Sequence, residues 1–127
     1  GRADFDTESL SLDDENNIIE LGLENPELND IDARYVGLLK FSQRGLAYIT
    51  EIYDDACRNF KDMPWQQSGK TVQKAYMTDL LNAVIQSGEE VKAERFQNGW
   101  IEFDTNDDYE KACDWVGDGS IYSILRI

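Results

Sequence analysis

The segment from residue 98 to residue 109 constrains the fold most, because a turn, a short strand and a capped helix start follow one another within it. Asn98-Gly99 is typical of a tight turn, since both residues tolerate positive φ. The next five residues, 100–104, alternate between two faces as a β-strand does. The face expected to carry the polar chemistry holds Trp100, Glu102 and Asp104.

The expected helix after this strand begins at Thr105. Thr105 is a good N-cap, and Asp108, three positions later, completes a capping-box pattern that also suits the helix dipole. The helix is predicted over roughly residues 106–116. Asp104 then lies at the C-terminal end of the strand, where α/β proteins tend to place their chemistry. The carboxylates of Glu102 and Asp104 are expected on one side of the strand, about 7 Å apart at Cα.

Two carboxylates in this arrangement are compatible with two interpretations. Mg²⁺ takes one or two protein carboxylates together with substrate phosphate oxygens, so Glu102 and Asp104 could hold a metal ion or orient a substrate. Alternatively, they form a solvated strand edge before a helix N-terminus that favours acidic residues. Spacing alone leaves both open, because paired carboxylates are often structural.

Charge and composition disfavour several function classes. The chain suits a single domain over residues 1–127, with a formal charge of −14 and no histidine. Nucleic acid and anionic membrane surfaces attract clustered Lys and Arg, so neither is an expected partner. The lack of histidine removes the commonest general base and the usual zinc sites. Cys57 and Cys113 lack CxxC spacing, so both are expected to be buried thiols in a reducing compartment. The sequence shows no membrane span and no signal peptide, and we therefore expect a cytoplasmic location.

The remaining segments predict an α/β fold, a mixed sheet with flanking helices. A β-hairpin is expected around residues 13–17, and a buried strand at residues 35–41. Gly37 within that strand suggests that a ligand or another backbone approaches closely, and packing against a helix is the alternative. Trp65, in a loop, could be a ligand platform, although a satellite hydrophobic contact is the more frequent explanation. A strand at residues 91–96 is expected to pair antiparallel with residues 100–104.

Two further helices are predicted, over residues 43–60 with Ser42 as N-cap and over residues 72–86 with Ser87-Gly88 as the stop. The tail at 121–127 is apolar enough to dock as a strand or against a helix. Spacings of three and four predict the buried stripe of each helix. These stripes are Leu46, Ile49, Tyr53, Ala56, Cys57 and Phe60; Met77, Leu80, Leu81 and Val84; and Tyr109, Ala112, Cys113 and Val116.

Four segments resemble the C-terminal half of nucleotidyltransferases, namely the sugar-phosphate, phosphocholine and phosphonate nucleotidylyltransferases with a GT-A-like, Rossmann-related fold. Residues 99–109 are similar to that family's GWxEIDTxEDY strand-to-helix turn. Residues 75–81 resemble its YLTDLL helix, residues 35–42 its YxGLxKFS strand, and residues 12–22 its xDxDGRIxEIG hairpin. The resemblance covers nearly the whole chain in the expected order. It implies the C-terminal portion of this fold, closest to the branch that activates small phosphorylated or phosphonate acceptors.

The resemblance also implies a chemistry. In this family an acceptor phosphate or phosphonate oxygen attacks the α-phosphorus of a nucleoside triphosphate and displaces pyrophosphate, with Mg²⁺ between the two anions. It implies that Asp104 is a Mg²⁺ ligand and that Glu102 contacts the substrate or supports the ligand. Trp100 and Gly37 are further expected substrate-binding positions, and no catalytic acid or base is assigned. The family's glycine-rich nucleotide loop, its Pro-Lys pair and its other metal aspartate are absent from this sequence.

Three functions therefore remain open. The chain could be the C-terminal piece of a nucleotidyltransferase, inactive alone because a strongly acidic chain without a phosphate loop should repel a triphosphate. It could be a stand-alone acidic binding module that kept part of the fold. It could also be an unrelated acidic interaction protein that blocks a basic partner surface. Exposed sheet surface in such a piece makes a homodimer plausible.

Overall fold

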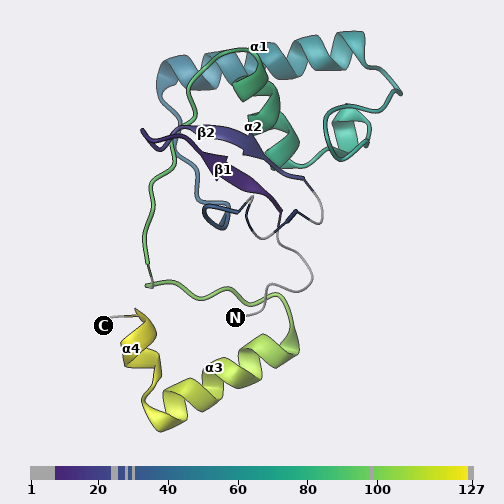
Figure 1. Cartoon of the computed structure of the whole chain (residues 1–127). Coiled ribbons are helices and arrows are strands. Elements are labelled where there is room, and N and C mark those ends of the chain that lie inside the picture. Colours follow the sequence, from purple (N-terminus) through teal and green to yellow (C-terminus); the bar gives the residue numbers. More distant parts are fainter. Residues whose placement is uncertain (1–7, 24–25, 28, 30, 98, 126–127) are drawn as a thin grey trace. The chain divides into compact units, whose positions relative to one another are not determined.

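The computed structural model describes residues 8–23, 26–27, 29, 31–97 and 99–125 (Figure 1). The chain divides into two compact units, Gly1–Glu94 and Arg95–Ile127, and each is described by itself. The secondary structure is mixed α/β, with a two-stranded antiparallel sheet and helices. Within the described ranges, no helix is long and apolar enough to cross a membrane. One domain over residues 1–127, like the GT-A-like topology, stays a prediction.

The first unit contains the predicted hairpin. Strand β1 (Leu10–Leu12) pairs antiparallel with β2 (Ile18–Leu21), which confirms it. The polar turn closes on Asp13, whose carboxylate accepts hydrogen bonds from the Asn17 backbone N–H at 2.8 Å and from the Asn17 side-chain amide at 2.8 Å. An aspartate that binds the backbone just ahead of it favours a turn over a continued strand, so the polar run folds the chain back on itself.

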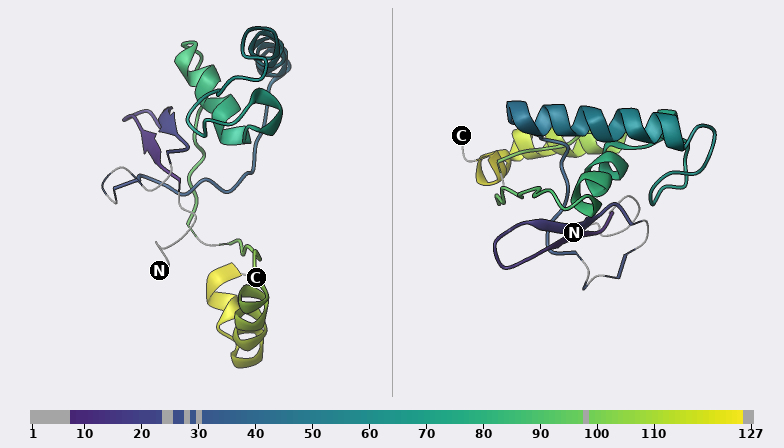
Figure 2. Two further views of the ribbon diagram at one scale, coloured as in Figure 1. Left: turned by 90° about the vertical axis from the view of Figure 1, so that its right-hand side faces the viewer. Right: turned by 90° about the horizontal axis from the view of Figure 1, so that it is seen from above.

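Helix α2 (Met77–Gln86) packs on this hairpin, and α1 (Gln43–Asn59) packs on α2. Helix α1 begins as predicted at Ser42, whose Oγ accepts from the Gly45 N–H at 3.0 Å. The helix predicted over residues 72–86 starts later than expected: a short 3₁₀ helix (Val72–Lys74) and two extended residues precede α2 (Met77–Gln86). Gly88 follows α2 with a φ of 90°, which confirms the predicted stop. Figure 2 shows α2 between the hairpin and α1, in agreement with the contacts that α2 makes with both.

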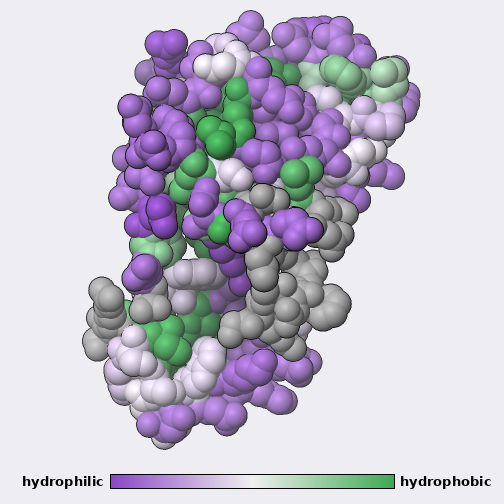
Figure 3. Space-filling model, viewed as in Figure 1, coloured by the Kyte–Doolittle hydropathy of each residue, from purple (hydrophilic) through white to green (hydrophobic). Residues whose placement is uncertain are grey.

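The core of the first unit consists of two clusters, one on each side of α2. The first joins the hairpin to α2 through Leu10, Ile18, Leu21 and Leu81. The second lies between α1 and α2 and contains Ala56, Trp65, Val72 and Ala83. Trp65 is only 5% exposed, so the predicted satellite contact is confirmed and the ligand platform is wrong. Polar side chains cover most of the face of this unit seen in Figure 3.

Two predicted strands of the first unit do not form. Residues 35–41 are irregular, with Leu38 83% exposed. Within residues 91–96, Lys92 makes an isolated bridge with Asn17, and the Val91 carbonyl accepts from the Ile18 N–H at 2.7 Å. Residues 91–93 therefore lie beside the hairpin, and neither residues 91–96 nor residues 100–104, which were predicted to pair, form a strand. β-compatible side chains produce a strand only where a partner backbone can complete the ladder.

The predicted apolar stripes are wider than the buried surface. Leu46, Tyr53 and Phe60 are 56%, 40% and 38% exposed. Of the predicted α1 stripe only Ala56 is fully buried, and Ile52, outside that stripe, packs partly buried beside it. Three further stripe members, Met77, Tyr109 and Val116, are 45%, 63% and 63% exposed. A helix that packs against one neighbouring element buries only the arc that faces it, which is narrower than its full apolar face.

The second unit contains α3 (Asn106–Asp118) and α4 (Ile121–Leu125). Helix α3 confirms the predicted helix and ends two residues later than expected, at Asp118, with Gly119 as its C-cap at a φ of 81°. The tail docks as helix α4, and the Ile124 carbonyl accepts from the Gly99 N–H at 2.7 Å. Asn98, the other residue of the predicted turn, lies outside the described residues.

Residues 100–104 form no strand, which corrects the central prediction for this segment. Their only described surroundings within the second unit are two helices and the adjoining irregular backbone, so no parallel or antiparallel ladder is available there. A strand needs inter-strand hydrogen bonds on at least one edge, and alternation of side chains alone does not supply them.

Candidate functional site

The predicted metal ligand, Asp104, stands immediately before the N-cap of α3 and is exposed. The cap itself confirms the sequence prediction. The Thr105 hydroxyl accepts from the Asp108 N–H at 3.2 Å, and the Asp108 carboxylate accepts from the Thr105 N–H at 3.0 Å. The two partners therefore satisfy each other's backbone donors, and the start of α3 is fixed next to Asp104.

Asp108 does more than close the capping box. Its Oδ2 also accepts from the Thr105 hydroxyl at 2.7 Å and from the Asp104 N–H at 3.3 Å. The hydrogen bond from the Thr105 side chain is the main cause that lowers the pKa of Asp108 below its ordinary value, and the backbone N–H groups of Asp104 and Thr105 act in the same direction. Asp108 is therefore a carboxylate that stays charged while it holds the backbone of residues 104 and 105.

The other predicted site residues of the second unit lie on the irregular segment. Trp100 is partly buried and meets Phe96 edge to face, with ring centroids 6.4 Å apart. Glu102 is exposed. The expectation that Trp100, Glu102 and Asp104 share a face rested on a strand that does not form, so the backbone does not enforce it. Substrate binding by Trp100 and Glu102 stays a prediction.

Gly37, the remaining predicted substrate-binding position, belongs to the first unit. Its φ is 72°, and a Cβ added there would meet no atom within 4 Å. The alternative of a glycine packed against a helix is therefore wrong. The positive φ accounts for the glycine, because side-chain-bearing residues rarely adopt this conformation. Ligand contact at Gly37 stays a prediction.

A divalent metal would find few protein ligands in the part of the chain that the structure describes. No group of three or more His, Cys, Asp or Glu side chains converges there. Asp104, with or without Glu102, offers one or two carboxylates, a donor set that fits Mg²⁺ when phosphate oxygens and water complete its shell.

Cys57 is a partly buried thiol, and Cys113 is exposed, so burial of Cys113 was predicted wrongly. Its position on the outer side of α3 explains the difference.

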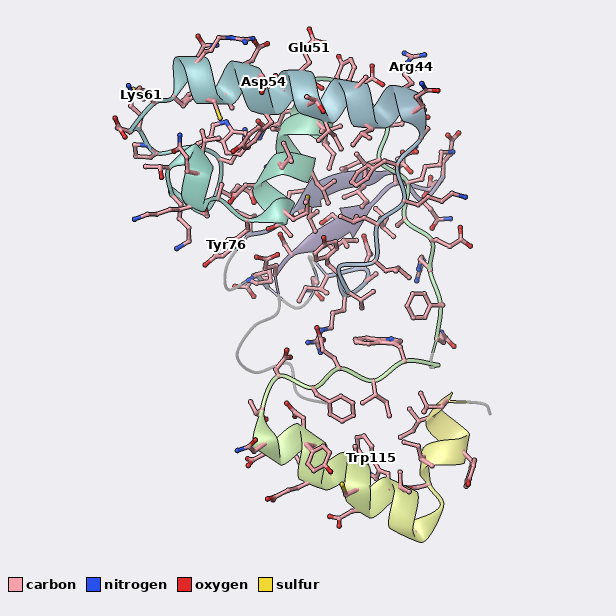
Figure 4. The ribbon with its side chains drawn as sticks, turned by 180° about the vertical axis from the view of Figure 1, so that it is seen from behind. Arg44, Glu51, Asp54, Lys61, Tyr76 and Trp115 are labelled. Atoms are coloured by element: carbon pink, nitrogen blue, oxygen red, sulfur yellow. The ribbon has the colours of Figure 1, made fainter. Side chains whose placement is uncertain are left out.

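Sequence reasoning missed a second aspartate with a comparable role, Asp79. Its carboxylate accepts from the Tyr76 N–H at 2.8 Å and from the Ser68 N–H at 3.0 Å, and the residue is 3% exposed. The signal was the spacing of three between Tyr76 and Asp79, which is that of a capping box. Tyrosine is an unusual N-cap, so the pattern passed unnoticed. Figure 4 shows Tyr76 at the start of α2, and its ring lies under the Lys70 ammonium at 5.0 Å.

Comparison with known proteins relates the chain to nucleotidyltransferases. Over 93 residues it is 32% identical to a CTP:phosphoglutamine cytidylyltransferase of Campylobacter jejuni subsp. jejuni serotype O:2, a match that covers 73% of this chain and 35% of the relative. The matched part thus spans about a third of that curated relative. No protein-family model matches the chain, and no solved structure does. The match confirms the nucleotidyltransferase relationship that the sequence motifs predicted.

Proposed function

We propose that this chain works as part of a nucleotidyltransferase, in which it carries the acceptor side and one carboxylate for Mg²⁺. The observation that carries the proposal is the 32% identity to a cytidylyltransferase. The exposed Asp104 at the start of a capped helix supports it, because an exposed carboxylate on a fixed backbone can join a metal shell without losing a structural bond. That relative's name gives CTP and phosphoglutamine, so we propose CTP as the donor and a small phosphorylated molecule as the acceptor.

The reaction in this proposal is a displacement at phosphorus. An oxygen of the acceptor phosphate forms a bond to the α-phosphorus of CTP, and the bond from that phosphorus to the bridging oxygen breaks, so that pyrophosphate leaves with the electron pair. Mg²⁺, when bound, would reduce the repulsion between the two anions and stabilise the leaving charge. Asp104 would hold that ion, and Glu102, Trp100 and Gly37 would contact substrate. The catalytic contribution of the protein is positioning and charge neutralisation.

The 127-residue chain alone is expected to be inactive. Its formal charge of −14 repels a triphosphate, and its sequence has no glycine-rich loop to hold one. The activity therefore belongs to a longer polypeptide or a complex that supplies a phosphate-binding element. A homodimer stays a prediction, and light scattering of the chain would test it.

The test uses the longest product of the reading frame that contains this segment. Pyrophosphate release is measured with CTP, Mg²⁺ and a panel of small phosphorylated acceptors that includes phosphoglutamine. Asp104→Ala should lower turnover by more than about 100-fold, beyond the loss typical of a residue that only supports a metal ligand. Asp107→Ala, which removes a neighbouring carboxylate of the same helix start, is the matched control and should retain activity.

Near-normal turnover of Asp104→Ala would count decisively against the metal assignment. Absence of pyrophosphate release from the unaltered product with CTP and every acceptor of the panel would favour the two non-catalytic alternatives, an acidic binding module or an acidic interaction protein. The 127-residue chain, assayed in parallel, should release no pyrophosphate above background.

A further inference from the structure

One carboxylate oxygen of Asp108 accepts three hydrogen bonds at the start of α3. Asp108 Oδ2 accepts from the Thr105 hydroxyl at 2.7 Å, the Thr105 N–H at 3.0 Å and the Asp104 N–H at 3.3 Å. A capping box needs only the bond to the N-cap N–H. The bond to Asp104 lies outside the helix, and it reaches the peptide of the proposed metal ligand.

We propose that Asp108 is a positioning residue, which fixes the backbone of Asp104 so that the Asp104 carboxylate is presented to a divalent cation. This inference rests on the proposed function, since it concerns the same site. In this proposal Asp108 acts through Asp104: its Oδ2 accepts from three donors of the neighbouring backbone and hydroxyl, and one of them is the Asp104 N–H.

The hydrogen bond from the Asp104 N–H to Asp108 matters because the backbone before α3 is irregular. In a strand, ladder hydrogen bonds would fix the peptide of Asp104, and residues 100–104 form no strand. Here the peptide of Asp104 is held by its N–H bond to Asp108, a residue of the first turn of α3. Asp108 is held in turn by the bond from its own N–H to the Thr105 hydroxyl, at 3.2 Å. With its peptide fixed, Asp104 keeps only its side-chain torsions free, so less freedom is lost when it binds a cation.

The test separates positioning from charge with four variants of the 127-residue chain. Asp108→Ala removes the charge and the acceptor, Asp108→Asn removes the charge but keeps an oxygen that accepts N–H bonds, and Asp107→Ala removes a charge from the same helix start. Asp104→Ala removes the proposed ligand. Mn²⁺ is titrated into each, and paramagnetic broadening of the backbone amide signals reports where the ion lies. Activity is not required for this readout.

In the unaltered chain the amides of residues 102–105 should broaden at the lowest Mn²⁺ concentration. Asp104→Ala should abolish this preference, and Asp108→Ala should raise the required Mn²⁺ concentration by about 10–100-fold, the usual effect of losing a group that orients a metal ligand. Asp108→Asn and Asp107→Ala should both stay close to the unaltered chain. Exchange of the Asp104 amide hydrogen should accelerate in Asp108→Ala and not in Asp107→Ala, while the α3 amide shifts show that the helix persists.

Other outcomes overturn the inference in distinguishable ways. If Asp104→Ala abolishes the effect but Asp108→Ala behaves like Asp107→Ala, the positioning role falls and the metal assignment stands. If all three charge-removing changes at Asp107 and Asp108 weaken the effect equally, general electrostatics explains it and the positioning role falls. If the unaltered chain shows no preference for residues 102–105, the metal assignment and the positioning role fall together.

Discussion

Helices α2 and α3, which belong to different units of the molecule, begin with the same capping arrangement. In each, an aspartate three residues after the N-cap accepts the N–H of the cap residue, Asp79 from Tyr76 at 2.8 Å and Asp108 from Thr105 at 3.0 Å. The surroundings differ. Asp79 is 3% exposed, whereas Asp108 lies at the surface of its unit beside the exposed Asp104.

The second partner of each aspartate shows what that difference means. Asp79 reaches the N–H of Ser68, in the loop that precedes the 3₁₀ helix, and so ties two distant parts of the first unit together. Asp108 reaches the N–H of Asp104, only four residues away. A buried carboxylate that joins separate segments is a structural element, whereas a partly exposed one that orders its own neighbours can serve a functional group at little cost to stability. The sequence motif is shared, and burial decides its role.

The largest expected effect on stability is that of Asp79→Ala. The change removes the acceptor of two part-buried hydrogen bonds, from the N–H groups of Tyr76 and Ser68, and a buried donor left without a partner costs up to about 1–3 kcal/mol. Urea denaturation of the chain, followed by the fluorescence of Trp65 after replacement of Trp100 and Trp115 by Phe, should show this loss. Asp79→Asn keeps one of the two acceptor oxygens and sets an NH2 group against the other N–H donor, so it should recover only part of the loss. A loss within about 0.5 kcal/mol, typical of surface positions, would contradict the structural role.

Asp108→Ala should have a smaller effect on stability. Its donors, the N–H groups of Asp104 and Thr105, lie at the surface, where water replaces the lost acceptor, so the loss should be smaller than that of Asp79→Ala. Amide hydrogen exchange of the first turns of α3 measures it, with Asp107→Ala as the control. If Asp108→Ala destabilised its unit as strongly as Asp79→Ala destabilises the first, the contrast between a structural and a functional cap would be wrong.

Local signals in the sequence predicted most helix boundaries, with the start of α2 at Met77 instead of residue 72 as the exception. Ser42, the Thr105–Asp108 pair and Gly88 each specify a helix end through contacts within a few residues. The hairpin turn at Asp13 is local in the same sense. Such contacts depend little on the rest of the fold, and this is why the sequence reveals them.

Predictions that depend on distant partners were less successful. The strands at residues 35–41 and 100–104 needed neighbouring strands that do not lie beside them in their units. Burial of the whole predicted α1 stripe would require a second element packed over Leu46 and Tyr53, and both side chains are exposed. In the candidate site, the cap next to Asp104 followed from the sequence, but the bond from its backbone to Asp108 did not, because no spacing rule extends the capping box to the residue before the cap.

A third aspartate tests whether the number of hydrogen bonds, rather than their location, gives Asp108 its role. Asp13 is exposed, like Asp104, and its carboxylate accepts three bonds, from the Glu15 N–H at 2.9 Å and from the Asn17 N–H and side-chain amide at 2.8 Å each. It closes the hairpin turn, and no metal is proposed there. Asp13→Ala should therefore leave the Mn²⁺ concentration needed at residues 102–105 unchanged, although as many bonds are lost as in Asp108→Ala.

The pH dependence of Asp13 follows from the same bonds. The side-chain hydrogen bond from Asn17 is the main cause that lowers the pKa of Asp13 below the ordinary 3.8, and the Asn17 backbone N–H adds to it. Because the folded pKa is the lower one, the contribution of Asp13 to stability is fully present above pH 3.8 and is lost as the pH falls through the folded pKa. Asn17→Ala removes the main cause, so the pKa of Asp13 should rise towards 3.8 but stay below it, since the backbone N–H remains. Carboxyl ¹³C NMR titration of Asp13 measures this rise, and an unchanged pKa in Asn17→Ala would show that the turn backbone alone holds the carboxylate.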